Sequence, residues 1–64
     1  MSRPSRGALL LVSLSRSESD EWRDEAFRTK ALATFGRMAR EKGRRYLEVR
    51  DNVGRELTVA EVTP

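Results

Sequence analysis

Three hydrophobic patterns follow one another along this chain, and their order limits the folds that it can adopt. Residues 8–14, ALLLVSL, form a nearly continuous apolar run, whose length favours a buried strand. From about residue 19 to residue 42 the apolar positions recur every three or four residues, which is typical of a helix with one buried side. After Gly43 the period changes to two, which predicts two more strands. The expected order is strand, helix, strand, strand.

The helix between residues 19 and 42 has clear start and stop signals. Its buried side is predicted at Phe27, Ala31, Phe35 and Met38, widened by Leu32, Thr34 and Ala39. Ser17 or Ser19 is suited to be the N-cap, since a serine hydroxyl accepts a bond from a free backbone N–H. Gly43 is suited to end the helix in the left-handed conformation. Gly36 lies inside the helix and marks either a bend or a close approach of another backbone.

The second and third strands are expected to form a hairpin. Leu47 and Val49 alternate with polar side chains, and Leu57 and Val59 resume the alternation. Residues 51–54, DNVG, have the composition of a four-residue turn. We therefore expect an α+β domain over residues 7–62, with tails at 1–6 and 63–64. A right-handed crossover places the second strand parallel to the first, either adjacent to it or one position away. We expect the third strand to fill that gap, which gives a three-stranded sheet in the order 1-3-2 with one long helix on one face.

The first strand is apolar on both of its sides, although a single helix covers only one face of a sheet. Leu9 and Leu11 alternate with Leu10 and Val12, so one of these sets lacks a partner within the chain. A helix of about 24 residues would also be about 36 Å long, and its acidic first turns should extend past the sheet. We therefore expect a homodimer, or a fold that depends on a partner chain, to cover the exposed strand. The alternative is a central first strand, covered by Tyr46, Thr58 and Val62.

The composition argues against an enzyme. The chain has 64 residues and neither cysteine nor histidine, so the commonest metal ligands and the commonest neutral-pH general base are missing. Paired carboxylates such as Glu21 and Glu25 are better suited to a helix start than to acid–base work. The four glycines are isolated and form no phosphate-binding loop. We expect no catalytic residues, no cofactor, no metal and no small-molecule substrate.

The start of the chain only partly resembles a signal peptide. Basic residues precede the apolar run, but no small-residue cleavage site follows it and acidic residues come at once. A transmembrane helix needs about 20 apolar residues, and no such run exists. We expect a cytoplasmic protein that does not enter membranes.

Charge is distributed unevenly, and eleven of the thirteen cations are arginine. Residues 28–55 carry nine cations and three anions, whereas residues 16–25 carry five anions and two cations. A basic segment of this kind is suited to binding phosphates. Two observations argue the other way: an arginine bias also arises from coding composition, and i,i+4 pairs such as Asp24–Arg28 and Arg37–Glu41 would neutralise part of the positive charge. As one hypothesis, a nucleic-acid site would use Arg23, Lys30, Arg37, Arg40, Arg44, Arg45 and Tyr46.

The other hypothesis is a protein-binding surface on the outer side of the helix, formed by Trp22, Ala26, Ala33 and Arg40. An exposed tryptophan is enriched at binding hot spots, but Trp22 is equally suited to fold back onto Leu14. The organisation of strands, helix and an EVRDNVGREL hairpin resembles that of many small bacterial and phage domains. The preferred hypothesis is a small regulatory module that binds a protein partner as a homodimer, and the alternative is nucleic-acid binding.

Overall fold

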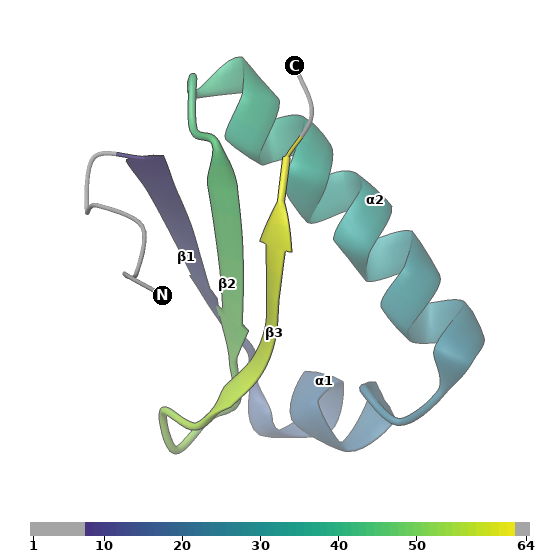
Figure 1. The fold of residues 1–64 in the computed structure, drawn as a ribbon. Coiled ribbons are helices and arrows are strands. Elements are labelled where there is room, and N and C mark those ends of the chain that lie inside the picture. Colours follow the sequence, from purple (N-terminus) through teal and green to yellow (C-terminus); the bar gives the residue numbers. More distant parts are fainter. Residues whose placement is uncertain (1–7, 63–64) are drawn as a thin grey trace.

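The sheet is built around β2 (Tyr46–Arg50), which pairs with a neighbour on each side. In the computed structural model, which describes residues 8–62, β1 (Leu9–Ser13) runs parallel to β2 and β3 (Glu56–Glu61) runs antiparallel to it (Figure 1). Between β1 and β2 the chain forms α1 (Arg16–Glu21) and α2 (Glu25–Glu41). The α+β class is confirmed, whereas the predicted tails, residues 1–6 and 63–64, lie outside the described residues.

The predicted strand order 1-3-2 is wrong, because the sheet has the order β1-β2-β3. The crossover places β2 directly beside β1, so no gap is left for β3, and the hairpin folds β3 onto the free edge of β2. Burial agrees with this order, since Leu47 and Val49 of the central strand are 2% and 0% exposed. Glu56 and Glu61 give β3 the charged residues that are typical of an edge strand.

The long helix predicted over residues 19–42 is two helices with a break at residues 22–24. The first is capped by Ser15, and not by Ser17 or Ser19, because Ser15 and Glu18 form a reciprocal capping box. The second is capped by Asp24, whose carboxylate accepts the Ala26 N–H at 2.9 Å. The acidic turns therefore fold into α1 at the end of the sheet and do not prolong α2.

The end of α2 is formed as the sequence predicts. Gly43 has a φ of +69°, and its N–H donates to the Arg40 carbonyl. The Arg44 N–H reaches back to the Ala39 carbonyl at 2.8 Å. This pair of bonds is a Schellman motif, which turns the chain from α2 into β2.

One hydrophobic core lies between the sheet and α2. Its buried members are Leu14, Trp22, Leu47 and Val49, and they are surrounded by half-buried Leu10, Val12, Phe27, Ala31, Leu32, Phe35 and Val62. Three of the four residues predicted for the buried side of α2 belong to this set, whereas Met38 is 38% exposed. All core side chains of the sheet lie on its helix side, so the opposite face has no element of residues 8–62 packed on it.

Candidate functional site

The open face of the sheet is the first candidate surface. The strand register places Leu9, Tyr46 and Glu61 in one row across this face. The next row contains Leu11, Glu48 and Val59. Leu11 is 53% exposed and Val59 is 45% exposed, and the nearby Leu57 is 37% exposed. Large apolar side chains are thus presented together on the face that α2 does not cover.

An ion pair between a buried glutamate and a half-buried arginine lies in the middle of this face. Glu48 is only 5% exposed and is flanked in its row by Leu11 and Val59. The Arg50 guanidinium donates to the Glu48 carboxylate, which gives this charge the partner that a buried ion requires. Arg50 also reaches the Gly54 carbonyl at 3.5 Å. The open face therefore combines exposed apolar groups with a fixed charged group at its centre.

A groove of about 310 Å³ between α2 and β3 is the second candidate surface. Since α2 packs over β1 and β2, the helix side of β3 is left to line this groove. We call it the α2–β3 groove, and it is lined by Leu32, Ala33, Gly36, Arg37, Arg40, Leu47, Ala60, Glu61 and Val62. Its floor is apolar and its charged groups belong to the rim.

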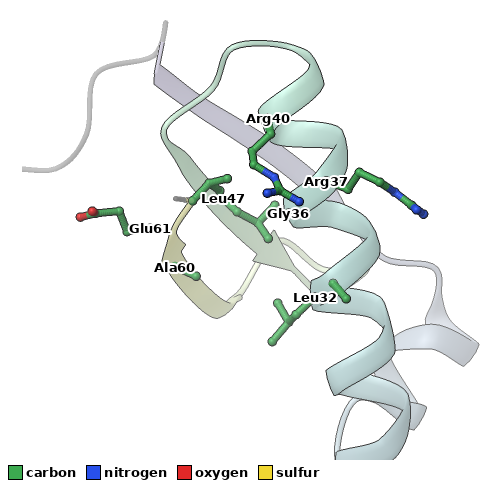
Figure 2. Close-up of a pocket in the computed structure, with 9 residues that line it drawn as sticks. Leu32, Gly36, Arg37, Arg40, Leu47, Ala60 and Glu61 are labelled. Atoms are coloured by element: carbon green, nitrogen blue, oxygen red, sulfur yellow. The ribbon is translucent and has the colours of Figure 1, made fainter. Parts of the chain in front are cut away.

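The cations of the α2–β3 groove have no counterion in the described part of the chain. Among residues 8–62 the ion pairs are Arg50–Glu48 and Arg55–Asp51. The predicted Arg37–Glu41 and Asp24–Arg28 pairs are thus not formed. Figure 2 shows Arg40 reaching from α2 toward the strands, while Arg37 and Glu61 point away from the groove on opposite sides. Arg40 is accordingly the cation best placed to meet an occupant.

Of the two alternatives for Trp22, the structure has the side chain folded back into the core with Leu14, at 6% exposure, and not on an exposed binding surface. The break between the helices turns it inward, where it packs with Leu14 and meets the Phe27 ring edge-on at 6.3 Å. Its indole N–H donates to the Thr58 hydroxyl at 3.3 Å. The Arg28 guanidinium donates to the Trp22 carbonyl at 2.8 Å, which takes the place of the expected pair with Asp24.

The rest of the predicted protein-binding set is exposed but divided. Ala26, Ala33 and Arg40 all lie on exposed positions of α2. Ala33 and Arg40 line the α2–β3 groove, whereas Ala26 lies in the first turn of the helix, away from it.

The predicted nucleic-acid set is likewise not gathered into one site. Arg37 and Arg40 line the α2–β3 groove, and Arg45 and Tyr46 line a smaller hollow with Glu61 and Val62. Lys30 borders a third hollow beside Glu18. Arg44 is half-buried in the turn after α2, and Arg23 lies in the break between the helices.

Sequence reasoning missed the residues that the other elements contribute to these two surfaces. Val59 and Glu48 were not among the predicted site residues, although their alternation with the core positions places them on the open face. The floor of the α2–β3 groove combines Gly36 of α2 with Ala60 and Val62, which come more than twenty residues later in the sequence. The pattern of a single strand or helix contains no signal for such a floor.

Two carboxylates have lowered pKa values, and each stabilises a local structure, one a helix cap and the other a turn. The Arg55 backbone N–H, with help from that of Val53, lowers the pKa of Asp51 in the hairpin turn. The Ser15 backbone N–H, with help from its hydroxyl, lowers the pKa of Glu18 in the capping box. Residues 8–62 contain no cluster of acidic side chains placed to hold a metal ion. In the same range, neither helix is long and apolar enough to cross a bilayer.

The chain was compared with protein-family models, curated proteins and solved structures. No protein-family model, curated protein or solved structure matches it.

Proposed function

We propose that this protein is a small non-enzymatic module that acts by binding a protein partner, and that two copies pair through the open face of the sheet. The observation that carries the proposal is the exposure of Leu11 and Val59 on a face with no covering element among residues 8–62, with the exposed Leu57 beside them at the register shift of β3. Burying such side chains is the main favourable contribution to protein association. In a chain this short, a second copy also enlarges a marginal core.

The arrangement of charge supports a second copy as the occupant of the open face. The acidic α1 follows the end of β1, whereas Arg44 and Arg45 precede the start of β2. Because β1 and β2 are parallel, these charges lie at opposite ends of the sheet. A two-fold axis across the strands would bring the basic end of one copy to the acidic end of the other, and it would bring the two Glu48–Arg50 pairs together.

Light scattering after size exclusion, over a concentration series, tests the pairing. We expect twice the chain mass for the natural sequence and the single-chain mass for Leu11→Lys, because a lysine on the open face adds a charge that the pairing would desolvate. Val53→Lys is the matched control, since Val53 is 68% exposed in the hairpin turn and lies off the face. A natural chain that stays monomeric at every concentration contradicts the proposed pairing.

Nucleic-acid binding is the second candidate function, and it is favoured by Arg37 and Arg40, which form no ion pair among residues 8–62. It predicts binding of a labelled single-stranded oligonucleotide with an affinity that falls steeply with salt. Replacing both arginines by alanine should weaken binding and make the salt slope shallower, as followed by fluorescence anisotropy. Salt-independent binding would exclude a phosphate-directed mode.

A further inference from the structure

The α2–β3 groove lies beside an open edge of the sheet. β3 is the last strand in the order β1-β2-β3, so only one of its edges is paired within the described chain. The Val62 N–H donates to the Arg45 carbonyl at 2.7 Å, which marks that residue as bonded toward β2. Alternation along an antiparallel ladder then directs the backbone N–H and C=O of Val59 and Glu61 to the outer edge.

The helix-facing side chains of a strand added at this edge would enter the groove. A neighbouring strand lies about 4.8 Å away in the sheet, and every second side chain points to the same face. Ala60 and Val62 of β3 already line the groove, so the next side chains on this face lie beside them. Leu32 and Leu47 complete an apolar floor that is suited to a large apolar side chain.

The charge of Arg40 indicates that the bound segment carries a carboxylate. Arg40 is directed toward the strands and has no ion-pair partner among residues 8–62 (Figure 2). A carboxylate two residues from the buried apolar side chain would be on the same face of an added strand and within reach of this guanidinium.

We propose that the groove binds an extended acidic segment of the partner protein, added as a fourth strand at the outer edge of β3. This inference rests on the proposed function and names the part of the partner that is recognised. One apolar side chain of the segment fills the groove, a carboxylate pairs with Arg40, and the backbone bonds to Val59 and Glu61. Binding by strand addition gives affinity through the backbone and specificity through alternate side chains.

Gly36 offers a way to close the groove without disturbing the fold. A Cβ at this position has no heavy atom within 4 Å, and the residue lies in the lining of the groove. A Cβ at position 36 is therefore accommodated, and the rest of a leucine side chain would extend into the groove and take the space meant for the partner. Thr29→Leu is the matched control, since Thr29 is an exposed position of α2 outside the groove.

The experiment measures the fluorescence anisotropy of a labelled hexapeptide with capped ends and the order threonine, leucine, threonine, aspartate, threonine, leucine. Its two leucines and its aspartate then lie on one face of the added strand. We expect saturable binding to the natural chain, weakened about ten-fold or more in Gly36→Leu and unchanged in Thr29→Leu. Arg40→Glu should weaken binding by a similar factor and should bind instead the peptide with lysine in place of aspartate. N-methylation of one alternating set of peptide amides should abolish binding, and N-methylation of the other set should not.

Each contrary result overturns the inference in a distinct way. Absence of peptide binding by a chain that still forms the dimer removes the groove assignment and leaves the proposed pairing intact. Equal binding by Gly36→Leu places the peptide elsewhere. An oligonucleotide that loses its binding in Gly36→Leu, when the peptide does not bind, assigns the groove to nucleic acid. A higher oligomer of the natural chain that Gly36→Leu abolishes assigns it to a further copy.

Discussion

Trp22 shows how one side chain decides between a binding surface and a core. Tryptophan gains most from burial when its ring is enclosed and its N–H keeps a partner. The Thr58 hydroxyl provides that partner from β3, and Leu14 and Phe27 enclose the ring. Trp22 therefore joins the strand side of the core to the start of α2, and its importance is structural.

Trp22→Ala should lower the free energy of unfolding by about 3–5 kcal/mol, because it leaves a large cavity. A chain of this length has about 3–10 kcal/mol in total, so the substitution should remove a large part of its stability. Urea unfolding followed by circular dichroism measures the change. Thr58→Val keeps the packing and removes only the acceptor, which should cost about 1–3 kcal/mol. A Trp22→Ala variant as stable as the natural chain would contradict this account of the core.

Asp51 makes stability depend on pH at acid values. Its pKa is lower in the folded chain than in the unfolded chain, chiefly because of the Arg55 backbone N–H. The unfolded chain therefore binds the proton first, so stability is fully present above an ordinary aspartate pKa of about 4 and is lost as pH falls below it. The urea midpoint of Asp51→Asn should change less over this range than that of the natural chain. Asp20→Asn, an exposed position of α1, controls for the change in charge.

At the scale of elements, the helix caps decide where the chain turns. The hydrophobic periodicity of the segment gives no sign of the helix break at residues 22–24. The capping residues do mark two helix starts: Ser15 together with Glu18 caps α1, and Asp24 caps α2. Two starts within ten residues divide the segment into a short helix and a long one. The cap chemistry thus outweighs the periodicity that predicted one helix.

Asp24→Ala tests the second start. The substitution removes the acceptor for the Ala26 N–H and should lower the free energy of unfolding by about 1 kcal/mol. Chemical denaturation measures this change, and Asp20→Ala provides the control on an aspartate that caps no helix. An effect no larger than that of the control would show that α2 is held by packing alone.

The strands and the end of α2 could be predicted from the sequence, but the break between the helices and the arrangement of the strands could not. The strands, the hairpin at residues 51–54 and the stop at Gly43 follow from local patterns, and the structure has all of them. The order of strands is a non-local property, since the same alternation suits both 1-3-2 and 1-2-3. The groove itself was not predicted, because its floor is assembled from three elements; of its lining, only Ala33, Arg37 and Arg40 were among the predicted site residues, and they belonged to two different hypotheses.

At the scale of the whole molecule, charge is separated along the strands. Residues 16–25 are acidic, residues 40–45 carry four cations and one anion, and the fold places α1 and the α2–β2 turn at opposite ends of the sheet. If two copies pair with these ends opposed, salt should weaken the dimer by screening their attraction. Sedimentation velocity at low and high salt measures the shift in the monomer–dimer equilibrium. Pairing that is stronger at high salt would indicate apolar contact without the opposed ends.

The row of Leu9, Tyr46 and Glu61 has a mechanical consequence. It places the first residue of β1 and the last of β3 at the same end of the sheet, on either side of the central strand. A stretching force applied at these two residues would peel the outer strands sideways from β2, breaking the ladder bonds one after another. Because these bonds break one at a time, tension applied between residues 9 and 61 should open the sheet at low force, beginning at this end.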